Sequence, residues 1–86
     1  MSGNDVRATV KGFILDQFLP GEDPEALTDD TPLITAGIVD SMGALRLVAY
    51  LEETFGVRIQ AHEVDVEHLN TLDSIAALIE GKRGAR

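Results

Sequence analysis

The dipeptide Asp40-Ser41 holds the side chains whose types and position best fit covalent chemistry in this sequence. It follows Gly37-Ile38-Val39 and opens the most apolar helical pattern of the chain. An aspartate before a helix can accept hydrogen bonds from the free N–H groups of the first turn. Ser41 then falls at the first helical position, where partial positive charge favours anionic groups. Ser41 is therefore well placed to carry a phosphate ester, although an arbitrary Asp-Ser pair more often serves only as a cap.

Three amphipathic helices are expected to position this serine. Apolar residues recur with a helical period over residues 4–19, 41–55 and 71–80. Pro20-Gly21 should end the first helix, and Thr71 should cap the last. In the middle helix the inward stripe is predicted to consist of Leu45, Val48, Leu51 and Phe55, and to be widened by Met42, Leu47 and Tyr50.

Within that middle helix, Gly43 and Ala44 lie about one turn from Ser41, so their small size predicts an open approach to the hydroxyl. Gly56 is expected to stop the helix, because glycine adopts the left-handed conformation of a C-terminal cap at little cost.

The connections between the helices complete the predicted fold. Residues 20–40 form a long loop, which is expected to pack back over the core through Leu27, Leu33, Ile34, Ile38 and Val39. Its acidic residues lack the spacing of an EF-hand. Residues 57–59 predict an extended linker, and residues 61–68 a short helical turn. The fold class is therefore all-α: a small bundle of three main helices plus one short helix, with a long loop between helices 1 and 2.

Length and composition narrow the functional classes. Eighty-six residues make one small domain, predicted at residues 1–81, with a basic disordered tail at 82–86. The chain has no cysteine, so thiolate metal sites and cysteine nucleophiles are excluded. A net charge of −8 disfavours nucleic acid and anionic membranes, and no apolar stretch is long enough to cross a membrane. We expect a cytoplasmic monomer without membrane insertion.

Other candidate sites are weaker. His62-Glu63 begins like a zinc-protease helix, but residue 66 is valine rather than histidine. His62 and His68 form no recognisable base–nucleophile pair with Ser41, so an enzyme is not expected and no metal site is predicted. Ser74, in Asp73-Ser74-Ile75, lacks the preceding apolar run and is expected to be an ordinary first-turn residue.

The order of these segments resembles the acyl carrier protein family over roughly residues 5–80. The similarity lies in Gly37-Ile38-Val39-Asp40-Ser41-Met42, in Leu51 to Val57, and in Thr71-Leu72-Asp73-Ser74-Ile75. In that family an Asp-Ser-Leu motif accepts phosphopantetheine from coenzyme A on its serine. The resemblance therefore implies a small acyl-carrier-like bundle with covalent phosphopantetheine on Ser41, with Asp40 recognised by the transferase and Met42 in place of leucine.

The resemblance also implies the partners: a phosphopantetheinyl transferase, an acyl- or aminoacyl-activating ligase, and a downstream acyltransferase or synthase. The docking residues are expected to be Met42, Arg46, Glu52 and Glu53. Fatty acid synthesis carriers are typically acidic just after the serine, whereas Gly43, Ala44 and Arg46 stand here. The expected role is thus a specialised carrier of acyl groups in a lipid, polyketide or secondary-metabolite pathway.

Two alternatives remain open at this point. One is an aminoacyl or peptidyl carrier loaded by an adenylating enzyme, since such carriers also tend to have a neutral flank after the serine. Their signature more often has a glycine and another residue before the serine, whereas Asp40-Ser41 is shared with acyl and D-alanyl carriers. The other is an acidic helical adaptor without a cofactor, for which Ser41 would be dispensable.

Overall fold

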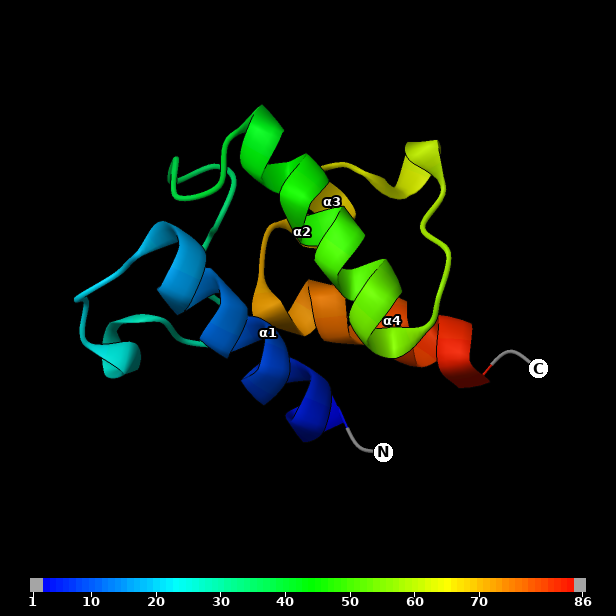
Figure 1. The fold of residues 1–86 in the computed structure, drawn as a ribbon, viewed down its shortest axis with the longest axis horizontal. Coiled ribbons are helices and arrows are strands. Elements are labelled where there is room, and N and C mark those ends of the chain that lie inside the picture. Colours follow the sequence, from blue (N-terminus) through cyan, green and yellow to red (C-terminus); the bar gives the residue numbers. More distant parts are fainter. Residues whose placement is uncertain (1–2, 85–86) are drawn as a thin grey trace.

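The computed structural model describes residues 3–84, which form a helical bundle without strands in that range (Figure 1). The elements, in chain order, are α1 (Gly3–Phe18), η1 (Pro24–Ala26), α2 (Ser41–Phe55), η2 (Ala61–Glu63), α3 (Val66–Leu69) and α4 (Leu72–Gly84). Helix α1 packs against α4, and the short α3 packs against the same helix. The all-α fold class with three main helices is therefore confirmed.

One continuous core joins these elements. Its members are apolar side chains from α1, α2, α3 and α4, from the long loop and from the extended segment after α2. The buried residues are Val6, Val10, Ile14, Leu27, Leu33, Val39, Leu47, Leu51, Ile59, Leu69, Leu72, Ile75, Ala76 and Ile79. None of the helices in residues 3–84 is both long and apolar enough to cross a membrane.

The long loop between α1 and α2 packs on the core, as predicted. Leu27, Leu33 and Val39 are buried. Asn70 fastens the loop to the other end of the chain: its backbone oxygen accepts from the Leu33 N–H at 2.5 Å, and its side-chain oxygen accepts from the Ile34 N–H at 2.7 Å. The loop therefore delivers the chain to the start of α2 along a fixed path.

Helix α2 has the predicted bounds, but its inward face differs from the prediction. Leu47 and Leu51 are fully buried, whereas Leu45 is 59% exposed. The predicted stripe was therefore wrong at Leu45 and at Met42, which is 70% exposed, and correct at Leu47 and Leu51. The helix is apolar on more than one side, so periodicity alone could not choose the buried side. Gly56 ends the helix with φ 66°, and its N–H donates to the Glu52 carbonyl.

The segment after α2 differs in detail from the single helical turn predicted at residues 61–68. The chain is extended up to Gln60 and then forms η2 and α3 as separate short elements. Val64 and Asp65 lie between them, and the Asp65 side chain caps α3 by accepting from the His68 N–H at 2.9 Å. A new cap starts a new element, which explains the division.

The C-terminal helix begins as predicted but ends later. Thr71 Oγ1 accepts from the Ser74 N–H at 3.0 Å, which is the expected N-terminal cap. Helix α4 then continues through Gly81 to Gly84, so the predicted end at residue 81 was wrong. Lys82 and Arg83 belong to the helix rather than to a disordered tail, and residues 85–86 of that predicted tail lie outside the described residues.

Candidate functional site

Ser41 lies at the junction between the long loop and α2. The residue before it, Asp40, has the extended conformation of an N-cap, and its Oδ1 atom accepts from the Gly43 N–H at 2.7 Å. The Asp40 carbonyl accepts from the Ala44 N–H at 2.8 Å. The predicted cap is therefore present. Ser41 is exposed, and as the first helical residue it stands at the positive end of a helix of 15 residues.

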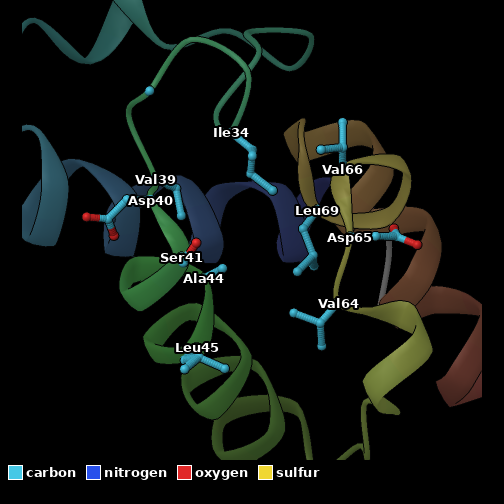
Figure 2. Close-up of a pocket in the computed structure, with 11 residues that line it drawn as sticks. Ile34, Val39, Asp40, Ser41, Ala44, Leu45, Val64, Asp65, Val66 and Leu69 are labelled. Atoms are coloured by element: carbon cyan, nitrogen blue, oxygen red, sulfur yellow. The ribbon is translucent and has the colours of Figure 1, made fainter.

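An apolar cavity of about 650 Å³ adjoins Ser41 between α2, α3 and the long loop (Figure 2). Ser41 lies at one side of this cavity. The apolar side chains that form its walls are Ile34, Val39, Ala44, Leu45, Val64, Val66 and Leu69. The carboxylates of Asp40 and Asp65 also border the cavity, but they point away from its middle in Figure 2. The space beside the serine is therefore suited to an apolar group rather than a charged one.

Most of the other large apolar residues of the bundle do not reach this cavity. Of Phe13, Leu45, Val48, Phe55, Ile59 and Ile75, only Leu45 lines the cavity beside Ser41. The sequence gives the apolar character of these side chains but not which helix interface each one enters. Leu45 reaches the cavity because α2 turns Leu47, rather than Leu45, toward the core.

The expected docking residues do not form one uniform surface. Met42 is 70% exposed, the largest exposure among the large apolar side chains described. Arg46 is exposed but is bound to α1, because its Nη2 donates to Gln17 Oε1 at 2.5 Å and its guanidinium lies 5.5 Å from the Phe18 ring centre.

The two acidic members also differ. Glu52 is partly buried and supports the backbone, since its Oε2 accepts from the Ile59 N–H at 2.8 Å. Glu53 is exposed. Of the two, Glu53 therefore presents its side chain to solvent, whereas Glu52 helps hold the chain that follows α2.

Phe18 and Gly43 are parts of the site that the sequence did not reveal. Gly43 is buried, and a Cβ atom added to it would lie 2.6 Å from Phe18 Cε1. The glycine is therefore needed for the close approach of this ring, not for the open access to Ser41 that was expected. The available sequence signal was the pairing of a glycine in a first helical turn with an aromatic residue at the end of α1.

The acidic edge of the cavity is organised by one histidine. His68 Nδ1 lies 2.7 Å from Asp65 Oδ1. This side-chain hydrogen bond, with the backbone bond from His68, holds the pKa of Asp65 below its usual value. The same side-chain contact raises the pKa of His68.

The other residues discussed from the sequence take structural places. Ser74 is partly buried and its hydroxyl is bonded to Thr71 Oγ1, so its interpretation as a first-turn residue is confirmed. Ligand atoms of Asp65, Glu67 and His68 lie within 4.8 Å of one another. Asp65 and His68 are already paired with each other through the α3 cap.

Comparison with known proteins identifies the family. Residues 19–79 match the family model described as the phosphopantetheine attachment site. The chain belongs to the phosphopantetheine-binding carrier protein family. The carrier is thus non-catalytic, and its cofactor is covalently attached phosphopantetheine. The resemblance drawn from the sequence is confirmed.

Two relatives that are named as carrier proteins agree with this assignment. The carrier is 34% identical over 71 residues to a D-alanyl carrier protein of Streptococcus suis, covering 83% of this chain and 86% of that protein. It is 32% identical over 81 residues to a D-alanyl carrier protein of Streptococcus sanguinis, covering 94% of this chain and 99% of that protein.

A solved structure described as an FAD-dependent dehydrogenase matches with a TM-score of 0.72 and 36% identity, over 80% of this chain and 96% of that chain.

Proposed function

We propose that this carrier holds an aminoacyl group as a thioester on a phosphopantetheine arm attached to Ser41. The observation that carries the proposal is the exposed Ser41 hydroxyl at the capped start of α2, inside the region that matches the attachment-site family. The D-alanyl carrier relatives support an amino acid as the load. This choice replaces the acyl load that the sequence favoured, and takes the aminoacyl alternative instead.

The attachment reaction needs little from the carrier itself. The Ser41 oxygen forms a bond to the phosphorus of the pantetheine phosphate in coenzyme A, and the bond from that phosphorus to the adenosine bisphosphate breaks. The hydroxyl proton passes to a base on the transferase, and Mg²⁺ held by that enzyme neutralises phosphate charge. Asp40 keeps the first turn closed through its bond to the Gly43 N–H and is proposed to be recognised by the transferase.

Loading of the amino acid then uses the thiol of the arm. The arm on Ser41 would supply the thiol that holds the amino acid as a thioester, after an adenylating ligase has activated the amino acid with ATP; pyrophosphate leaves in the activation and AMP in the transfer. The downstream enzyme takes the aminoacyl group from the thioester. For docking of these partners we propose the exposed face around Ser41 with Met42 and Glu53, while Arg46 and Glu52 support it from within the carrier.

A second candidate load is an apolar acyl group. The specific observation in its favour is the apolar cavity of about 650 Å³ beside Ser41. A small charged amino acid gains no stabilisation from such a space. An acyl chain that enters it removes apolar surface from contact with water, which is favourable. The two candidates differ in the ligase that loads the arm, so one assay separates them.

The first experiment is intact mass measurement after incubation with coenzyme A, Mg²⁺ and a promiscuous phosphopantetheinyl transferase. We expect a gain of one phosphopantetheine in the natural chain and in Ser74→Ala, and none in Ser41→Ala. No gain in the natural chain with several transferases would contradict the proposal and favour the acidic adaptor.

The carrier that has gained phosphopantetheine is then incubated with D-alanine-activating and other amino-acid-activating ligases. A separate sample is incubated with acyl ligases. A mass increase with an amino acid and ATP supports the aminoacyl load. Loading by acyl ligases alone would replace it with the second candidate.

A further inference from the structure

The Phe18 ring supports the first turn of α2. A Cβ atom at Gly43 would lie 2.6 Å from Phe18 Cε1 and 3.1 Å from Phe18 Cζ, so the ring edge rests directly on the Gly43 backbone. The N–H of the same glycine donates to Asp40 Oδ1 at 2.7 Å. The residue that closes the cap is therefore also the residue on which the aromatic ring packs.

Gly43 and Ser41 lie on nearly opposite sides of α2. Two residues of an α-helix correspond to a rotation of about 200° around the axis. Gly43 is buried, and Ser41 is exposed. Phe18 thus supports the turn from the side away from the hydroxyl and leaves the approach of a large enzyme to Ser41 unobstructed.

The Phe18 ring is itself held in place by its neighbours. The Arg46 guanidinium lies 5.5 Å from the ring centre and is fixed by its bond to Gln17 Oε1. The Phe13 ring meets the Phe18 ring edge to face at 6.0 Å and stacks on Tyr50 at 4.0 Å. A cation above the ring and an aromatic neighbour both favour one orientation of Phe18.

We propose that Phe18 is a positioning residue for the attachment of phosphopantetheine: its contact with Gly43 holds the Asp40 cap closed and so fixes the direction of the Ser41 hydroxyl. Arg46 acts in this arrangement by holding the ring. The inference depends on the proposed role of Ser41. A nucleophile misplaced by about 1 Å can lose rate by one to two orders of magnitude, so a support this close to the turn matters for catalysis on the carrier.

Three variants and one matched control test this role. Phe18→Leu removes the Cε1 and Cζ atoms that meet Gly43, and Gly43→Ala adds the methyl group that those atoms obstruct. The double variant Phe18→Leu/Gly43→Ala lacks both ring atoms near that methyl group, and Asp40 Oδ1, 3.1 Å from the Cβ position, is the close neighbour that remains. Phe55→Leu is the control, because Phe55 is also a partly buried aromatic residue but lies at the other end of α2 and is not among the atoms nearest the Gly43 Cβ position.

The measurement is the steady-state rate of phosphopantetheine transfer to each variant, at a temperature well below every melting point. We expect Phe18→Leu to lower kcat about tenfold with little change in the KM for the carrier, while Phe55→Leu keeps both constants. Gly43→Ala should also lower kcat. The double variant should load no more slowly than Phe18→Leu alone, because the ring atoms opposed by the methyl group are absent.

Amide hydrogen exchange supplies a readout that general destabilisation would not produce. The Gly43 amide should exchange faster in Phe18→Leu than in Phe55→Leu, while amides in the middle of α4 behave alike in the two variants. Equal kcat for these two variants, or equal protection of Gly43, would overturn the positioning role. Absence of loading in the natural chain would instead overturn the proposed function, and this role with it.

Discussion

The Lys82 ammonium lies 2.7 Å from Glu63 Oε1 and so joins the last turns of α4 to η2. Both side chains are mostly shielded from solvent, at 20% and 17% exposure. Glu63 in turn accepts from the Gln60 N–H at 2.8 Å through the same oxygen. This pair fastens the segment after α2 to the final helix, and it gives α4 a partner beyond Gly81.

Removal of this ion pair should loosen one end of the bundle. The hydrogen bond from Lys82, followed by that from the Gln60 N–H, holds the pKa of Glu63 below its usual value of 4.5. A lowered folded-state pKa adds stability that is present above the unfolded-state pKa and lost as pH falls through the folded-state pKa. In urea melts at pH 7 we expect Lys82→Met to unfold at a lower urea concentration than the natural chain. The difference between the two midpoint concentrations should shrink below pH 4.5. A constant difference across that range would contradict the assignment.

The Asp40 side chain should contribute separately to folding and to loading. Asp40→Ala removes the cap and is expected to cost about 1 kcal/mol of unfolding free energy, whereas Asp40→Asn keeps a capping oxygen and should cost little. If the transferase recognises the carboxylate, both variants load slowly. Normal loading of Asp40→Asn would show that the carboxylate matters only as a cap. Thermal melts and loading rates on the same samples separate these effects.

Leu45 and Leu47 form a matched pair that tests the orientation of α2. Leu47 is fully buried, so Leu47→Ala should cost about 2–5 kcal/mol of unfolding free energy. Leu45 is 59% exposed, so Leu45→Ala should change that free energy by less than about 1 kcal/mol. Chemical denaturation of the two variants checks the difference. Similar losses of unfolding free energy at both positions would contradict an orientation of α2 that buries Leu47 and exposes Leu45.

The His68–Asp65 pair predicts a specific pH dependence. Because the raised pKa of His68 lies above the unfolded-state value near 6.5, its stabilisation is complete below about pH 6.5 and is lost as pH rises through the folded-state pKa. Glu67 and Glu63 act on His68 in the same direction as Asp65.

His68→Gln should therefore lose stability relative to the natural chain at pH 5.5, with a smaller difference at pH 9. Amide exchange across α3 at these two pH values is the appropriate measurement. A difference that grows with pH would be inconsistent with a stabilising charged histidine.

The amino-acid sequence was enough to predict the α2 bounds, the Asp40 cap, the Thr71 cap and the packing of the long loop through Leu27, Leu33 and Val39. The caps depend on residues close together in the chain, namely a capping side chain and the N–H groups just after it, and the loop is recognisable by its apolar residues. The motif around Ser41 also lies in one short segment. For this reason the carrier family is recognisable from the sequence alone.

Three features depend on how the helices pack: which side of α2 is buried, where α4 ends, and what surrounds Ser41. Leu45 and Leu47 are equally apolar, and the choice between them depends on the placement of α1, α3 and α4 around the helix. The contact of Phe18 with Gly43 and the pairing of Lys82 with Glu63 join residues 25 and 19 positions apart in the sequence. Local propensity contains no information about such approaches, because they arise from how whole helices pack.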